Sequence, residues 1–190
     1  GLGKTPAMIW IKTMSSGTYG GVTHWTMSHE GLNSGTNPWQ YTMSLNNTWA
    51  EAATSNFGNT APTSRQFYVG DPGNGRSNDN DSNYLAILFA SVDGICKVGT
   101  YDGSNSTQTI PCGFQPRFFW QKRVTDTGNW HSCDTVRGWG AGADQFLFYD
   151  GDTGSSGYDF GAPTSTGFTL TGGAGTVSES GSKYIFYAHA

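Results

Sequence analysis

Short runs of apolar and aromatic residues, separated by clusters of Gly, Asn, Asp, Ser and Pro, recur along the whole chain. None of these runs reaches the roughly 10 residues that an amphipathic helix needs, and most are rich in aromatic or β-branched residues. The pattern therefore predicts an all-β protein whose strands are short and are joined by turns. The predicted strands are residues 8–11, 39–43, 66–69, 84–90, 118–122, 145–149, 168–170 and 184–190.

Composition supports this fold class. The chain has 190 residues, of which 28 are Gly, and 14% are aromatic. Glycine weakens helices and suits tight turns, whereas aromatic residues are enriched in strands. We therefore expect one antiparallel β-sandwich domain over residues 1–190, of the jelly-roll or concanavalin A lectin-like type.

The chain also contains an internal repeat. Residues 3–12 (GKTPAMIWIK) and 113–122 (GFQPRFFWQK) share Gly, Pro, Trp and Lys at an offset of 110. Further along, Trp25 matches Trp130 at an offset of 105, an Ala-Pro-Thr-Ser motif recurs at an offset of 101, and the closing aromatic strands match at an offset of 100. An ordered series of this kind predicts a duplication. The expected repeats are residues 1–91 and 113–190.

The segment between the repeats, residues 92–112, is expected to be a β-hairpin connector. Its turn is the Asp-Gly-Ser-Asn sequence at residues 102–105. In a hairpin centred on Ser104, Cys96 faces Cys112, and facing side chains are close enough for a disulfide. We predict that bridge, with two reduced thiols as the alternative. Cys133 is expected to be a buried thiol.

Charge narrows the possible partners. Charged residues make up only 13% of the chain, the net charge is −4, and the ten Lys and Arg residues are scattered. Phosphate binding needs clustered basic residues, so the sequence argues against nucleic acid. The longest apolar runs, residues 7–11 and 85–90, are far shorter than a bilayer span, which argues against membrane insertion. The opening residues lack an initiator Met, and we expect a fragment of a longer chain.

Catalytic signals are weak. Glutamate occurs only as Glu30, Glu51 and Glu179, each in a different local context, whereas glycosidases need two converging carboxylates. The chain also has no His-Glu-x-x-His pattern and no Gly-x-Ser-x-Gly motif. The sequence therefore predicts a protein that is not an enzyme.

Two groups of residues are candidates for binding instead. Asp79 and Asp81 place carboxylates in one loop and are candidate calcium ligands, but a solvated hairpin loop is the favoured interpretation, so no cofactor is expected. Trp39, Trp49 and Trp139 lie in Gly- and Asn-rich segments, where an exposed aromatic ring beside amides suits a sugar; burial in the core is the alternative. We treat these three tryptophans as candidate ligand-binding residues.

Several motifs together resemble a duplicated β-domain of unknown function that occurs in tail-fibre and other virion structural proteins of marine and cyanobacterial tailed phages. They are the Gly-x-x-Pro-x-Met-Ile-x-x-Lys opening at residues 3–12, the Ala-Pro-Thr-Ser segment at 59–70, the aromatic strand at 83–90 and the Lys-Val-Gly-Thr-Tyr-Asp-Gly segment at 97–103. The resemblance covers essentially the whole chain and brings no catalytic residues.

The resemblance implies a virion structural protein at the virion surface or outside the cell. The expected role is a tail-fibre or receptor-binding module that attaches to a host-surface glycan. Expected partners are that receptor, further copies of the chain in a homo-oligomer such as a trimer, and other virion proteins. The alternatives are a purely structural decoration or filament subunit without a ligand, and a glycan-degrading enzyme on a lectin-like sandwich.

Overall fold

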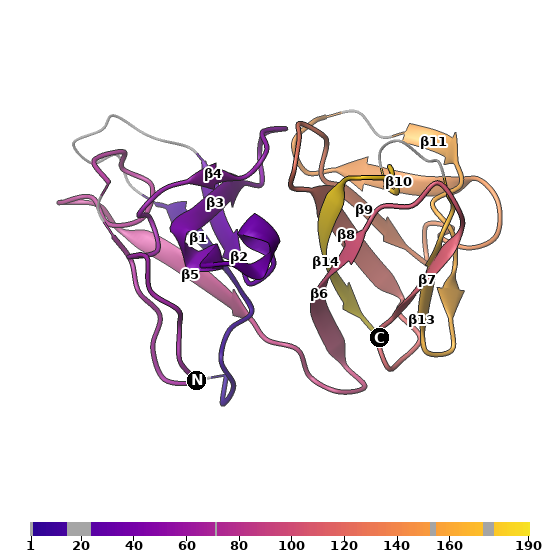
Figure 1. Ribbon diagram of the computed structural model, residues 1–190, viewed down its shortest axis with the longest axis horizontal. Helices are drawn as coiled ribbons and strands as arrows, with labels where there is room; N and C mark the ends of the chain where they lie inside the picture. The colour runs from indigo at the N-terminus through magenta and orange to yellow at the C-terminus, as the bar shows by residue number, and fades with distance from the viewer. Residues whose placement is uncertain (1, 15–23, 71, 153–154, 173–176) are drawn as a thin grey trace. The chain divides into compact units, whose positions relative to one another are not determined.

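The computed structural model describes residues 2–14, 24–70, 72–152, 155–172 and 177–190. The described chain is all-β, with three antiparallel sheets and two short 3-10 helices, which confirms the predicted fold class (Figure 1). It divides into two compact units, Gly1–Ala90 (unit 1) and Ser91–Ala190 (unit 2).

Unit 1 is built on one five-stranded sheet with the strand order β4-β3-β2-β1-β5. Apolar side chains of β1 and β5 pack with Trp39 and Phe57 on one face of this sheet. The elements are β1 (Met8–Thr13), β2 (Trp25–His29), η1 (Leu32–Gly35), η2 (Pro38–Gln40), β3 (Tyr41–Ser44), β4 (Ala52–Ala53) and β5 (Tyr84–Phe89).

Unit 2 has a six-stranded sheet of order β11-β10-β9-β8-β14-β6 and a three-stranded sheet of order β12-β13-β7. Its elements are β6 (Cys96–Asp102), β7 (Gln108–Pro111), β8 (Phe118–Arg123), β9 (His131–Asp134), β10 (Asp144–Phe148), β11 (Ser155–Tyr158), β12 (Pro163–Thr164), β13 (Gly167–Leu170) and β14 (Lys183–His189).

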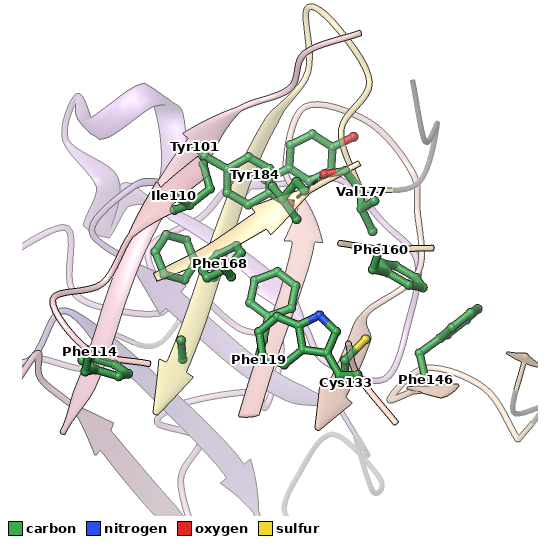
Figure 2. Packing of buried hydrophobic residues seen from close by; sticks show 14 residues of the cluster. Tyr101, Ile110, Phe114, Phe119, Cys133, Phe146, Phe160, Phe168, Val177 and Tyr184 are labelled. Atoms are coloured by element: carbon green, nitrogen blue, oxygen red, sulfur yellow. Dashed lines mark hydrogen bonds between the residues drawn. The ribbon is translucent and has the colours of Figure 1, made fainter. Parts of the chain in front are cut away.

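The core of unit 2 lies between these two sheets. Figure 2 shows Phe168, from the small sheet, among the aromatic rings of the large sheet. Its ring centroid is 4.5 Å from that of Phe119 and 5.4 Å from that of Phe186. Cys133 is buried in the same cluster, as the sequence predicted, and burial raises the pKa of its thiol. Unit 2 is therefore a two-layer sandwich held together mainly by aromatic packing.

The predicted hairpin at residues 92–112 is wrong. β6 pairs with β14 in the large sheet, and β7 pairs with β13 in the small sheet, so the turn between them carries the chain from one layer to the other. Cys96 consequently lies opposite His189, and the backbone N–H of Cys112 donates to Thr166. Both cysteines are free thiols, so the predicted disulfide is not formed. The segment belongs to unit 2 and is not a connector.

The two units share a strand order and a register. The order β4-β3-β2-β1-β5 in unit 1 recurs in unit 2 as β11-β10-β9-β8-β14. Trp10 pairs with Met27 and Trp120 with Ser132, which reproduces the offsets of 110 and 105 read from the sequence. On the other side, Thr13 pairs with Tyr84, and the matching pair in unit 2 is Arg123 with Tyr184, which reproduces the offset of 100.

Hydrogen bonds outside the strands recur at the same positions. The Trp25 N–H donates to Asn46 Oδ1 and the Trp130 N–H donates to Asp150 Oδ1. A second pair of hydrogen bonds fixes the loop before the last strand of each unit, β5 or β14. In unit 1 the Asp79 N–H donates to the Tyr84 hydroxyl oxygen at 2.8 Å. In unit 2 the Glu179 N–H donates to the Tyr184 hydroxyl oxygen at 3.0 Å.

Candidate functional site

Two of the three tryptophans predicted to bind sugar lie in the hydrophobic cores. Trp39 is 7% exposed and packs with Phe57 in unit 1, and Trp139 is 3% exposed and stacks on Phe119 in unit 2. Neither indole presents a face on which a sugar ring can lie. The prediction is therefore wrong for Trp39 and Trp139, because packing within each unit buries residues that their polar sequence neighbours suggested were exposed.

Trp49 is the exception, because 53% of its surface is exposed. It lies between β3 and β4, where its backbone N–H donates to Asn47 Oδ1. The ring of His24 lies beside the indole, with centroids 5.6 Å apart. The Asn46 side chain, which accepts from the Trp25 N–H, ties the start of this loop to β2. An anchored loop thus holds an exposed indole in place, which is how aromatic sugar-binding platforms are built.

Beside this indole lies a hollow of about 240 Å³. Its walls combine a methionine, two alanines, two hydroxyl-bearing residues of β3 and one arginine. We call this surface the Trp49 site. Its residues are Thr42, Met43, Ser44, Trp49, Ala50, Ala52 and Arg76.

Arg76 gives the Trp49 site its charge. The described residues offer this guanidinium no ion pair. Burial lowers the pKa of Arg76, which nonetheless stays charged at neutral pH as arginines do. Burial, and then the positive charge of Arg76, lowers the pKa of His24, so the imidazole is neutral at pH 7. The site therefore combines one half-buried cation, a neutral ring and an open indole face.

The Trp49 site has no equivalent in unit 2. The matching loop reads Asp150-Gly151-Asp152-Thr153, so the tryptophan is absent there. Two wall positions of β3 also change: Thr42 corresponds to Phe146, and Ser44 to Phe148. The shared sheet is thus common to both units, whereas this surface is specific to unit 1. Within the sequence, the signal for the site was a tryptophan directly after Asn46-Asn47-Thr48.

The loop of the candidate calcium ligands Asp79 and Asp81 is held by its own hydrogen bonds. The Asp79 N–H donates to the Tyr84 hydroxyl, and the Asp79 carboxylate accepts from the Ser82 hydroxyl at 3.3 Å. Asp81 has φ of 63°, matched by Gly181 at 84° in unit 2, so both residues occupy the same turn position. No group of three or more His, Cys, Asp or Glu side chains suited to a metal ion occurs in the described parts of the chain. Within those parts, Asp79 and Asp81 have no third ligand of those types beside them.

Two of the three glutamates, Glu51 and Glu179, make structural contacts. Glu51 Oε2 accepts from the Asn33 N–H of η1 at 2.6 Å. Glu179 forms an ion pair with Arg123 in unit 2. Buried Asp144 accepts from the backbone N–H groups of Gly140 and Phe160, which ties β10 to the loops around it. These carboxylates have structural contacts, and none of those contacts places two of them together as an acid and base.

The structure is thus an all-β chain of two compact units. The chain belongs to the DUF7483 family, a domain of unknown function, whose model matches residues 1–190. No curated protein matches the chain, and no solved structure matches it. The described helices are two 3-10 turns, and neither has the length or apolar character of a membrane span.

Proposed function

We propose that this domain is a receptor-binding module of a tailed-phage virion and that the Trp49 site attaches it to a host-surface glycan without making or breaking a bond. The observation that carries this proposal is the exposed indole of Trp49 beside a hollow with hydroxyl-bearing walls and one cation. Apolar faces of sugar rings stack on indoles, and their hydroxyl groups bond to amides and hydroxyls.

Arg76 indicates the kind of sugar. A guanidinium binds carboxylates through two parallel hydrogen bonds, and partial burial strengthens such a pair. A glycan that carries a carboxylate, such as one with a uronic acid, would supply the anion that Arg76 lacks among the described residues. We therefore propose an acidic glycan, with its ring on Trp49 and its carboxylate on Arg76.

The virion setting rests on the sequence resemblance described above, and the composition supports it. A surface with few charges and many hydroxyl and amide groups suits an extracellular protein that binds neutral and mildly acidic sugars. A single shallow site binds weakly, so we propose that the module acts as a homo-oligomer, such as a trimer, whose copies engage several glycans together. We also infer that the two units arose by duplication, which their shared strand order and register support, and that the fold is lectin-like.

The alternative is a purely structural role in the virion. It predicts no affinity for any sugar, so one glycan array separates the two functions. The array should carry neutral and acidic glycans and should be probed with the native oligomer, with added calcium and with chelator. Saturable binding to an acidic glycan is the expected result, and a blank array from folded protein would favour the structural role.

Trp49→Ala is expected to weaken glycan binding by at least about tenfold, which corresponds to the loss of one stacking contact. Because the indole is largely exposed, the same change should leave the free energy of unfolding nearly unaltered. Trp49→Phe should retain part of the affinity, and Arg76→Gln should reduce binding of acidic glycans more than of neutral ones. Undiminished binding by Trp49→Ala would place the sugar elsewhere.

A further inference from the structure

The closing strands of the two units differ at their outer edges. In unit 2, β14 is hydrogen-bonded to β8 on one side and to β6 on the other. In unit 1, the corresponding strand β5 pairs with β1 and has no neighbour on its other side within the strands that the structure describes. An apolar edge strand that is left open in this way is a ready template for another strand.

Side chains at matching positions are less buried in unit 1 than in unit 2. Tyr184, Phe186 and Ala188 of β14 are fully buried, as is Phe168 of β13. Their counterparts in unit 1 are only partly buried, although they pack against the core cluster of that unit. Leu85 is 43% exposed, whereas its counterpart Ile185 is completely buried. The counterparts in unit 1 are Tyr84, Ala86, Leu88 and Phe67.

In unit 2, the strands β6 and β7 provide this cover. Tyr101 of β6 stacks on Tyr184 with ring centroids 4.9 Å apart, and both rings are buried. β7 pairs with β13 along the small sheet and buries Ile110. Unit 1 has no such strand pair among its described residues, and its segment 66–69, which corresponds to β13, forms no strand.

A groove marks the uncovered position. A hollow of about 180 Å³ lies between Leu88 of β5 and the turn at residues 63–67, and Leu2, Lys4 and Pro6 complete its walls. In unit 2 the matching space lies between β14 and the β12–β13 turn, where β7 reaches Gly167 through Pro111. We call the space between β5 and residues 63–69 the β5 groove.

We propose that the β5 groove binds an extended two-stranded segment of a partner polypeptide, which pairs with β5 as β6 does with β14 and with residues 66–69 as β7 does with β13. The partner strand runs antiparallel to β5. By the register of unit 2, the partner's equivalents of Lys97, Gly99 and Tyr101 lie opposite Leu88, Ala86 and Tyr84.

The size of one partner side chain, the equivalent of Gly99, can be predicted from the side chain that it would face. Gly99 of β6 lies opposite Phe186, and a Cβ on Gly99 would come within 2.7 Å of the Phe186 ring. In unit 1, Ala86 takes the place of Phe186 and is only partly buried, so no aromatic ring at this position blocks a larger side chain on a neighbouring strand. Because protein interiors leave little space unfilled, the partner carries a large apolar side chain where β6 has Gly99. The partner strand is therefore a variant of β6 and not a copy of it.

The test uses two synthetic peptides that span residues 94–112, both with Cys96 and Cys112 replaced by Ser. One peptide retains Gly99 and the other carries Gly99→Phe. The full chain is titrated with each peptide in a calorimeter. We expect the Phe peptide to bind at least about tenfold more tightly, since it buries one additional phenyl ring. Ala86→Phe in the protein should reverse this order, because it recreates the Phe186 environment.

A variant that merely fails to fold would bind neither peptide, so it could not reverse the order of affinity for the two peptides. Trp49→Ala should leave peptide binding unchanged, so a failure of the glycan proposal and a failure of this one are distinguishable. Absence of binding by both peptides, or the same preference in the wild type and in Ala86→Phe, would overturn the proposal. So would self-association of the chain that Ala86→Phe abolishes, because that result would assign the groove to a second copy.

Discussion

Gly103→Ala is expected to unfold unit 2. Gly103 follows β6 at the turn that carries the chain between the two sheets, and its N–H donates to the Ser182 carbonyl oxygen. A Cβ on Gly103 would lie 1.9 Å from the backbone carbonyl oxygen of Glu179. This oxygen belongs to the backbone of a loop that the Tyr184 hydroxyl holds in place. It therefore cannot move away from the new Cβ as the end of a flexible side chain could. We expect a loss of more than about 3 kcal/mol, above the usual range for a point substitution.

Hydrogen exchange measured by mass spectrometry on the full chain can check this expectation. Peptides from β8 and β14 should lose their slow exchange in Gly103→Ala, whereas peptides from β1 and β2 report on unit 1. Gly140→Ala is the matched control, because its new Cβ would meet nothing closer than 4.0 Å. Wild-type exchange in Gly103→Ala would show that the turn and the loop at Glu179 do not approach each other as described.

Phe119→Ala should have the second large effect. Phe119 of β8 is completely buried, and its ring lies 4.5 Å from that of Phe168 and 5.5 Å from that of Trp139. The substitution removes an aromatic side chain from the contact between the two sheets and leaves a cavity there. Such changes lower stability by about 3–5 kcal/mol.

The free energy of opening of the slowest amides in unit 2 measures this loss. Val136→Ala serves as the control, because Val136 is 81% exposed and its truncation should change stability by less than about 0.5 kcal/mol. Equal stability of the two variants would mean that the small sheet does not pack on Phe119, which would contradict the two-layer arrangement of unit 2.

The offsets read from the sequence recur in the strand pairing, because strand register leaves a direct trace in the chain. A paired strand needs its apolar residues at fixed positions, so Trp10 and Trp120, or Tyr84 and Tyr184, recur at the offsets that the pairing requires. The shortening between repeats falls in loops, where length is tolerated.

The errors share one physical origin, which is that local patterns do not say which layer a segment joins. The turn at residues 102–105 does reverse the chain, yet its two arms enter different sheets, and Cys96 and Cys112 are therefore not partners. Trp39 and Trp139 have polar neighbours in sequence but are buried by distant residues. The predicted strand at 66–69 has the right composition and lacks a paired neighbour among the described strands.

The described sheet of unit 1 matches the large sheet of unit 2 without the edge strand β6, and amide exchange at single-residue resolution tests this most directly. The Met14 N–H donates to the Asn83 carbonyl oxygen, so by antiparallel alternation the N–H groups of Ala86 and Leu88 point away from β1. We predict fast exchange at Ala86 and Leu88 and slow exchange at their counterparts Phe186 and Ala188, which face β6. Equal, strong protection at all four amides in the isolated monomer would contradict the account.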